Sequence, residues 1–441
     1  MQIDRFSAAA AGRAERTCRA ARNILALGAV ALLAGCGGLS GPGAPATAVA
    51  PVPAKAALPL DQAVLSLADA TLSRAQLPPP GPSGRHILVI DPLIDRATGG
   101  ETATTRSMEQ RIAGLVRDRH AALELHPFTT AALNERPLIL LGAITGVAEA
   151  GSLTVAAKGA PPAAYRIWAV LADLNTGRVL SHETAWVQPQ DVDATPTAFY
   201  RDSPVWLADG VTAAYLRTCA ANPGDPVDPA YLAALRSQAL VADGVRAYEA
   251  GRHAAALDLY DEARQLGAGS QVRIGNGLYL ANWALGRRDA AEAAFGEVID
   301  QGLARGRLAV KFVFSPGSAA FWPDPAVIGP YPLWIRQIAT RTAVSPVCLD
   351  IEGHTSPTGP AALNERLSLA RAERLRTRLV AVRPALAGRT RATGLGSEEP
   401  IVGTGADDAT DALDRRVEFE PLACPAIAAA GDGGRQAGLA E

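Results

Sequence analysis

Short apolar runs alternate with helix-like segments between residues 86 and 187. A short apolar run bounded by turn residues is typical of a buried strand, whereas apolar positions that recur about every 3.6 residues are typical of an amphipathic helix. The sequence therefore predicts helices at 105–120 and 129–136, and strands at 86–93, 123–128, 137–147, 165–174 and 178–187. A further short helix is predicted at 61–76.

The last two of these strands are joined by Asn175-Thr176-Gly177. Asn and Gly tolerate positive φ, so the tripeptide predicts a tight hairpin turn. The order of elements predicts an α/β domain over 85–222. Its layout and its hairpin are similar to small periplasmic domains of lipoproteins that activate penicillin-binding proteins or serve in curli secretion, and the resemblance implies a periplasmic domain.

A repeat occurs in the helical segment that follows, over residues 226–305. Gly251, Ala256 and Tyr260 recur 35 residues later as Gly286, Ala291 and Phe295. This spacing resembles the tetratricopeptide pattern, in which Gly closes a turn, a small residue lets paired helices approach and an aromatic ring fills the gap. Two copies are fewer than a stable solenoid needs, so neighbouring helices must cap them. Two interpretations stay open: a spacer between domains, or a groove that binds a periplasmic protein partner.

Strand-like and helix-like segments alternate again from residue 308 to residue 419, in the order strand, helix, strand, helix, strand, helix, strand. The first strand is predicted at 308–321. Val310, Phe312 and Phe314 are expected to point toward one face of it, because side chains alternate along a strand.

Five motifs in this region occur in the order typical of an OmpA-like peptidoglycan-binding domain. They are KFVF at 311–314, EGHTSPTG at 352–359, NERLSLARA at 364–372, GLGSEEPIV at 394–402 and DRRVEFE at 414–420. The resemblance implies a βαβαβαβ unit over 308–424 in which helices cover a mixed sheet. The predicted fold class is multidomain α+β: an N-terminal α/β domain, a short α-helical repeat segment and this C-terminal unit, followed by a disordered tail over 425–441.

Domains that this segment resembles bind the diaminopimelate side chain of the peptidoglycan stem peptide, which ends in an ammonium and a carboxylate on one carbon. The resemblance assigns the carboxylate to Arg371, since a guanidinium fork matches a carboxylate with two parallel hydrogen bonds. It places Asn364 and Thr355 at the pocket and Arg415 in the family's pair of arginines. Ser356 stands where the family has the aspartate that pairs with the ammonium.

Ser356 keeps a hydroxyl that accepts a hydrogen bond from an ammonium but lacks the charge of the aspartate. A hydrogen bond to a charged group contributes roughly 1.5–3 kcal/mol, or about ten- to a hundredfold in affinity. We therefore expect a pocket that is weakened or retuned toward other stem peptides. A second source of a carboxylate for the ammonium is the acidic segment that contains Asp407, Asp408 and Asp411. The alternative interpretation of Arg371 is an ordinary surface arginine of an amphipathic helix.

The N-terminus begins with a basic region, and residues 24–33 form an apolar run that is too short to span a bilayer but typical of an export signal. The run ends in Leu33-Ala34-Gly35-Cys36, which resembles a bacterial lipobox. The resemblance implies removal of a signal peptide over 1–35 and acyl chains such as palmitate on Cys36. Because residue 37 is Gly rather than Asp, it also implies the periplasmic face of the outer membrane. An ordinary signal peptide is the alternative.

Residues 36–84 are predicted to be the lipidated cysteine and a linker, because Pro, Ala and Gly dominate much of this range. Of the cysteines outside the signal, Cys348 precedes one predicted strand and Cys424 follows another, so they are candidates for a disulfide at a sheet edge. Whether they pair depends on a Cα separation that the sequence does not give. Cysteine and histidine spacings typical of a metal site are absent from the sequence, and neither a metal nor a cofactor is predicted.

Composition narrows the function further. The formal net charge is −2, and basic residues are interleaved with acidic ones, so a nucleic-acid partner is not expected. The sequence also lacks the motifs of a catalytic triad, a nucleotide loop or a carboxylate pair, which argues against an enzyme. Two functions remain: an outer-membrane lipoprotein that binds peptidoglycan and tethers the envelope layers, and a periplasmic scaffold that recruits a cell-wall synthase or a secretion partner.

Overall fold

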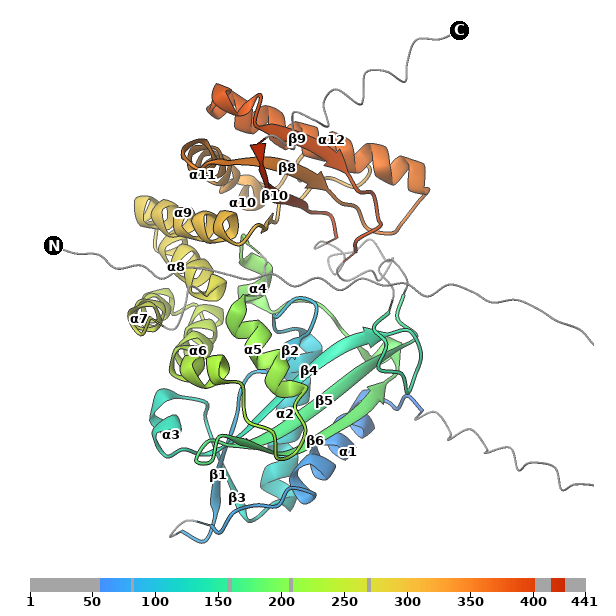
Figure 1. Cartoon of the computed structure of the whole chain (residues 1–441), viewed down its shortest axis with the longest axis vertical. Helices are drawn as coiled ribbons and strands as arrows, with labels where there is room; N and C mark the ends of the chain where they lie inside the picture. Colours follow the sequence, from blue (N-terminus) through green and yellow to red (C-terminus); the bar gives the residue numbers. More distant parts are fainter. Residues whose placement is uncertain are drawn as a thin grey trace, which may run out of the picture. The chain divides into compact units, whose positions relative to one another are not determined.

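The computed structural model describes residues 56–80, 83–156, 161–205, 209–267, 271–400 and 414–424. The predicted signal, Cys36, the acidic residues 407–411 and the predicted tail lie outside the described residues. Helices and two mixed sheets make up the described part (Figure 1). None of its helices combines the length and the apolar character that a bilayer crossing requires.

The first sheet has the order β3-β1-β4-β5-β6, with β2 added beside β4. Its strands are β1 (His86–Ile90), β2 (Ile94–Asp95), β3 (Leu123–His126), β4 (Leu138–Val147), β5 (Ala164–Asp173) and β6 (Arg178–Val187). The pairs β1–β3 and β1–β4 are parallel, whereas β4–β5 and β5–β6 are antiparallel. The five strands predicted between 86 and 187 are present, and Gly177 has a φ of +66° in the predicted hairpin.

Both faces of this sheet are covered. Leu138, Leu140 and Ile144 of β4 pack into one apolar cluster, and Ile139 and Leu141 pack into another. A strand buried on two faces reads as a continuous apolar run, which is why its sequence is so uniformly hydrophobic. The first cluster includes α1 (Leu60–Ser73) and α2 (Ala103–Arg119), and the second includes α3 (Thr130–Asn134), α5 (Gly210–Cys219) and the start of α6 (Pro229–Glu249).

The position of α1 corrects the predicted linker over 36–84. Ala63, Val64 and Leu67 of this helix are at most 2% exposed and lie in the cluster under β5 and β6. The preceding Leu58 forms a bridge to Val187 at the end of β6. The α/β unit therefore begins near residue 58 rather than at 85. The prediction missed this because composition alone does not show which amphipathic helix finds a sheet to cover.

Four helices follow: α6, α7 (His253–Gln265), α8 (Val272–Ala284) and α9 (Arg288–Ala304), each in contact with the next. A Cβ atom added at Gly244 of α6 would lie 2.6 Å from the Tyr260 ring of α7, and one added at Gly277 of α8 would lie 2.5 Å from it. Glycine at these two positions lets both helices approach the ring. Gly251 and Gly286, which follow α6 and α8, have positive φ values of +72° and +74°.

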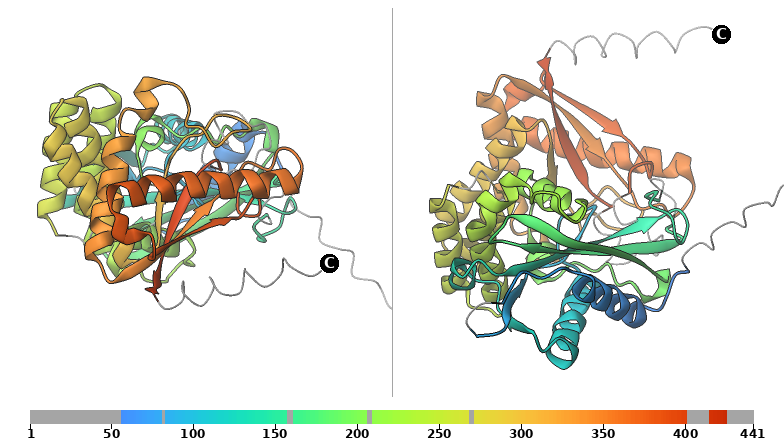
Figure 2. Two further views of the ribbon diagram at one scale, coloured as in Figure 1. Left: turned by 90° about the horizontal axis from the view of Figure 1, so that it is seen from above. Right: turned by 60° about the horizontal axis from the view of Figure 1, so that its bottom comes forward.

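The second sheet has the order β7-β10-β8-β9, in which only the β8–β9 pair is parallel. Its elements are β7 (Leu308–Val310), α10 (Pro325–Ile328), α11 (Tyr331–Val344), β8 (Val347–Gly353), α12 (Ala361–Val382), β9 (Thr390–Gly394) and β10 (Val417–Ala423). α12 lies along the sheet and contacts β8 and β9 (Figures 1 and 2). The acidic turn region expected before the last strand, at 405–414, lies outside the described residues except for Asp414. Cys348 and Cys424 form a disulfide with a Cα separation of 4.8 Å.

The first strand of this unit is shorter than predicted. It ends at Val310 because the Lys311 amide donates to the Pro204 carbonyl instead of continuing the ladder. Phe312 and Phe314 are nevertheless fully buried, as their alternation with Val310 predicted.

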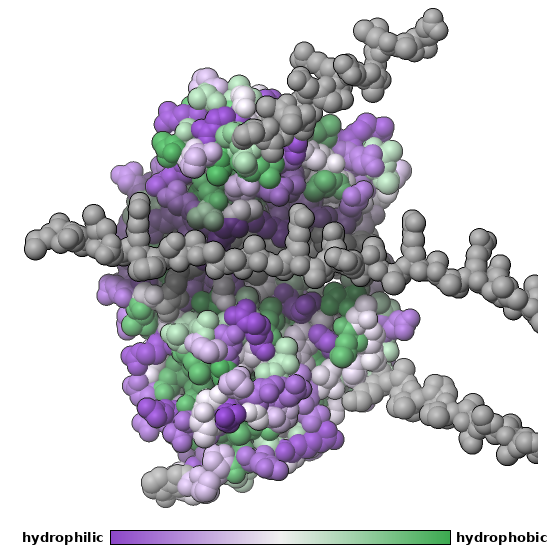
Figure 3. Space-filling view, in the orientation of Figure 1, coloured by the Kyte–Doolittle hydropathy of each residue, from purple (hydrophilic) through white to green (hydrophobic). Residues whose placement is uncertain are grey.

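The helices α8 and α9 share an apolar cluster with the C-terminal unit. Tyr279 of α8 and Phe295 of α9 pack against Trp334 of α11, whose indole N–H donates to the Tyr279 hydroxyl at 2.8 Å. The predicted segments 226–305 and 308–424 therefore have a common core. Hydrophilic and hydrophobic residues are interspersed over the coloured part of the face that Figure 3 shows.

Candidate functional site

The predicted pocket residues lie close together at the connection between β8 and α12. The turn after β8 carries Thr355 and Ser356, which are 3% and 4% exposed. Asn364 and Arg371 lie two turns apart on the buried stripe of α12 and are 4% and 1% exposed. The same stripe continues with Leu375 and Leu379, so its first half is polar and its second half is apolar. The first half of this stripe therefore departs from the apolar face that a core-packed helix usually presents.

Asn364 holds the turn in place. Its side-chain amide donates to the carbonyls of Ser356 at 3.5 Å and Thr358 at 3.1 Å. The Ser356 and Thr358 hydroxyls lie 3.0 Å apart, and the Thr355 amide donates to the Gly396 carbonyl at 2.8 Å. These contacts fix three chain segments around one point: the turn after β8, the start of α12 and the turn after β9.

The Arg371 side chain points toward the same place from a position on α12 two turns after Asn364. Its guanidinium donates to the carbonyls of Ser318 at 3.2 Å, Ser315 at 3.3 Å and His354 at 3.5 Å. It also lies over the Phe314 ring, with its central carbon 5.1 Å from the ring centroid. The guanidinium is thus oriented by backbone carbonyls from the loop after β7 and from the turn after β8. The structure places Arg371 inside the site, whereas the helical pattern alone did not separate it from Arg374.

Arg415 lies two residues before β10 and is 9% exposed. The neighbouring Arg416 carbonyl accepts from the His354 amide at 3.0 Å, which brings the pair of arginines next to the turn. The structure therefore brings Thr355, Ser356, Asn364 and Arg371 together, and Arg415 directly precedes the arginine whose carbonyl contacts this turn. The carboxylates proposed at 407–411 lie outside the described residues.

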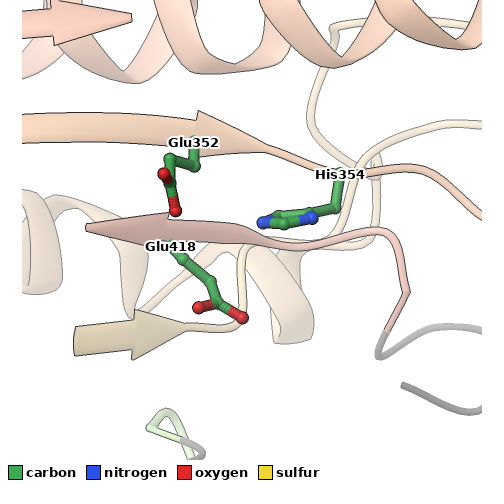
Figure 4. A group of neighbouring side chains, drawn as sticks. All are labelled: Glu352, His354 and Glu418. Carbon is green, nitrogen blue, oxygen red and sulfur yellow. The ribbon is translucent and has the colours of Figure 1, made fainter. Parts of the chain in front are cut away.

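A second polar group was missed by the sequence reasoning. It lies on the face of the sheet opposite α12 and consists of Glu352 of β8, His354 in the turn after β8, and Glu418 of β10 (Figure 4). Burial, together with the nearby Glu420 and Asp350 carboxylates, raises the pKa of Glu352 to about 7. Burial and the neighbouring Arg416 guanidinium lower the pKa of His354 to about 4.

The signal for this group was present in the alternation along β8. Leu349 and Ile351 point into the core, so Asp350 and Glu352 must point to the other face. The sequence reasoning used only the motif of the turn and did not follow the polar side of the strand.

The α/β unit holds a third polar group at the end of β1. The Asp91 carboxylate is 5% exposed and accepts from the Tyr231 hydroxyl of α6 at 2.5 Å. Burial raises the pKa of Asp91 to about 7. Glu101 pairs with Arg106 at 2.6 Å, and Glu109 of α2 accepts from the Leu93 amide at 2.6 Å. Each of these carboxylates has a protein partner, so the group joins α2 and α6 to the sheet.

The comparisons with known proteins found no matching family model and no matching curated protein. Among solved structures, the chain is similar to the periplasmic domain of Helicobacter pylori MotB, with 19% identity over 30% of this chain and 86% of that one. It is also similar to the cell wall anchor of the T6SS from Pseudomonas aeruginosa, with 28% identity over 26% and 80%. A third is the peptidoglycan-associated lipoprotein from Burkholderia pseudomallei, with 26% identity over 26% and 89%. Each TM-score is 0.22, so none of these similarities assigns a function to the chain by itself.

Proposed function

We propose that this chain is a cell-envelope protein that binds peptidoglycan non-covalently through the site around Arg371. The observation that carries the proposal is the meeting of Arg371, Asn364 and the turn at 354–358 at one buried point, in the order of motifs that the OmpA-like resemblance requires. The proposed ligand is the diaminopimelate end of the stem peptide, and Arg371 is the group that receives its carboxylate.

Backbone carbonyls already hold the Arg371 guanidinium in a fixed orientation. Its Nε and Nη2 atoms donate to two neutral carbonyls of the loop at 315–318, at 3.2 and 3.3 Å. A carboxylate that enters from this loop side replaces both carbonyls as acceptor. A carboxylate brings a full negative charge and can accept two parallel hydrogen bonds from the guanidinium fork, whereas each carbonyl is neutral and accepts one, so the exchange favours the ligand. Binding therefore requires the loop at 315–318 to move away from Arg371.

Ser356 then determines how well the ammonium is held. Its buried hydroxyl supplies an oxygen acceptor but no negative charge. We propose a moderate affinity for each site, and many weak contacts along a continuous polymer are enough for a tether.

A lipid on Cys36 is the proposed second attachment. Several acyl chains make a stable membrane anchor, whereas one is marginal. The segment between residue 36 and α1 is rich in Pro, Ala and Gly, and as an extended linker it would hold the folded part at a distance from the membrane. The disulfide between Cys348 and Cys424 fits an oxidising compartment such as the periplasm. The proposed protein is an outer-membrane lipoprotein with its folded part in the periplasm.

Co-sedimentation with isolated sacculi tests this function. We expect residues 37–441 to pellet with sacculi that contain diaminopimelate and to be released by an excess of the free stem peptide. Ser356→Asp restores the missing charge, so it should raise the affinity for sacculi by up to about tenfold and increase the pelleted fraction accordingly. An unchanged fraction for Ser356→Asp would argue against the assigned place of the ammonium.

The burial of Arg371 favours a second candidate, a periplasmic scaffold. In that case the three carbonyl contacts of Arg371 are purely structural, and the helices α6–α9 recruit a protein partner. A chain that remains in the supernatant with sacculi at every salt concentration would support this alternative.

A further inference from the structure

The sheet face opposite α12 carries carboxylates directly opposite each other. In the antiparallel register of β8 and β10, Glu352 is paired with Glu418 and Asp350 with Glu420. Like charges at directly opposed positions destabilise a sheet. Such an arrangement needs positive charge from another source.

Arginines supply part of this charge. The Asp350 carboxylate pairs with the guanidinium of Arg391, whose Nε lies at 3.0 Å. The Glu418 carboxylate pairs with Arg416 at 2.6 Å and with Arg307 at 2.7 Å. The Glu352 carboxylate, by contrast, has no hydrogen bond and no ion pair with any residue that the structure describes. The negative charge of Glu352 is therefore not balanced by an arginine, whereas the charges of Asp350 and Glu418 are.

His354 provides a second and independent observation. Its side chain is 1% exposed, and neither ring nitrogen has a hydrogen-bond partner in the described part of the chain. Buried polar side chains are nearly always hydrogen-bonded, so an unpartnered one requires an explanation. A neutral imidazole presents a lone pair on one of its ring nitrogens, and this is the form that binds a metal ion.

We propose that Glu352, His354 and Glu418 bind a divalent transition-metal ion of the zinc or manganese class. One ligand atom from each residue lies within 4.8 Å of the others (Figure 4). A metal about 2.1 Å from each ligand needs ligand atoms roughly 3–4 Å apart, so small side-chain rotations close the site. An imidazole with carboxylates suits zinc or manganese, whereas magnesium and calcium prefer oxygen ligands alone.

The surrounding arginines shape this site without blocking it. A carboxylate oxygen has two lone pairs, so Glu418 retains acceptor capacity while it pairs with Arg307 and Arg416. These pairs orient the Glu418 ligand, as partners behind a metal ligand commonly do. Their positive charge also lowers the affinity for a cation, and we therefore expect dissociation constants in the micromolar range. The site is separate from Arg371, whose hydrogen bond to His354 at 3.5 Å is to the backbone carbonyl and not to the imidazole ring.

Titration calorimetry tests the proposal. Residues 37–441 are dialysed against a chelator and titrated with zinc chloride and with manganese chloride at pH 7. We expect one bound equivalent, which excess magnesium does not displace. Glu352→Gln, which keeps the shape of a half-buried side chain, and His354→Gln should each weaken binding at least tenfold.

His126→Ala is the matched control. His126 also lies next to a glutamate, with its Nε2 atom 3.1 Å from Glu124, but this pair is only partly buried. The control should bind the metal as the unaltered chain does. The proposal is overturned if the chain binds neither metal, if Glu352→Gln binds as tightly as the unaltered chain, or if His126→Ala removes the bound equivalent. Circular dichroism establishes that each variant is folded.

Discussion

Asp91 is a carboxyl group held almost entirely away from water, with the Tyr231 hydroxyl as its partner. Burial raises its pKa from 3.8 to about 7. Because the folded-state pKa is raised, the contribution of Asp91 to stability is fully present below pH 4 and is lost as the pH rises through 7. Asp91→Asn keeps an acceptor for Tyr231 and removes the charge.

We therefore expect Asp91→Asn to raise the melting temperature relative to the unaltered chain at pH 8, and to raise it by less at pH 5, where part of the contribution of Asp91 is still present. Thermal melts followed by circular dichroism at the two pH values measure the difference. Asp258→Asn, at an exposed position of α7, is the control and should show no such pH dependence. Equal effects of Asp91→Asn at both pH values would contradict the account.

Two buried tyrosines make a matched pair. The Tyr260 hydroxyl has no hydrogen-bond partner in the described structure, whereas the Tyr231 hydroxyl donates to Asp91. Removing an unpartnered hydroxyl costs nothing, but removing a buried donor costs about 1–3 kcal/mol. We expect Tyr260→Phe to leave the free energy of unfolding unchanged or slightly raised, and Tyr231→Phe to lower it. Urea denaturation at pH 7 compares the two, and a larger loss for Tyr260→Phe would refute the assignment.

At the scale of elements, α12 lies close to the sheet because glycine occupies the end of β8. A Cβ atom at Gly353 would overlap the backbone carbonyl of Ser368 on α12. We expect Gly353→Ala to lower the free energy of unfolding by about 1–3 kcal/mol, since the helix must move to make room. Gly388→Ala is the control, because an added Cβ there meets no atom within 4 Å. Urea denaturation decides, and equal stability of the two variants would contradict this packing.

The elements themselves were largely predictable from the sequence. Apolar runs located β1, β4, β5 and β6, and the Asn-Thr-Gly turn located their hairpin. The motif of the turn and α12 identified Arg371, Asn364 and Ser356, which the structure brings together. The sequence pattern did not show which elements pack together. α1 was predicted as a helix, but the strands that it covers, β5 and β6, begin only at residues 164 and 178.

At the scale of the whole molecule, the boundary between the helical segment and the C-terminal unit was the least predictable feature. The two share a core through Tyr279, Phe295 and Trp334. From the sequence, each of these residues is predicted only to be a buried aromatic residue of its own helix. Their meeting depends on the angle between helices, and the local pattern carries no information about that angle. The polar sheet face around Glu352 was missed for a similar reason, since its members come from strands far apart in the chain.

The central claim is that the Arg371 guanidinium binds an acidic group of peptidoglycan. The most direct test compares the pelleting of residues 37–441, Arg371→Ala and Arg378→Ala with isolated sacculi at low salt. Arg378 is an exposed arginine of the same helix and controls for general charge. The account predicts that Arg371→Ala, verified as folded, binds ten- to a hundredfold more weakly, because a hydrogen bond to a charged group contributes roughly 1.5–3 kcal/mol, while Arg378→Ala pellets as the unaltered chain does. Equal pelleting of folded Arg371→Ala and the unaltered chain would contradict it.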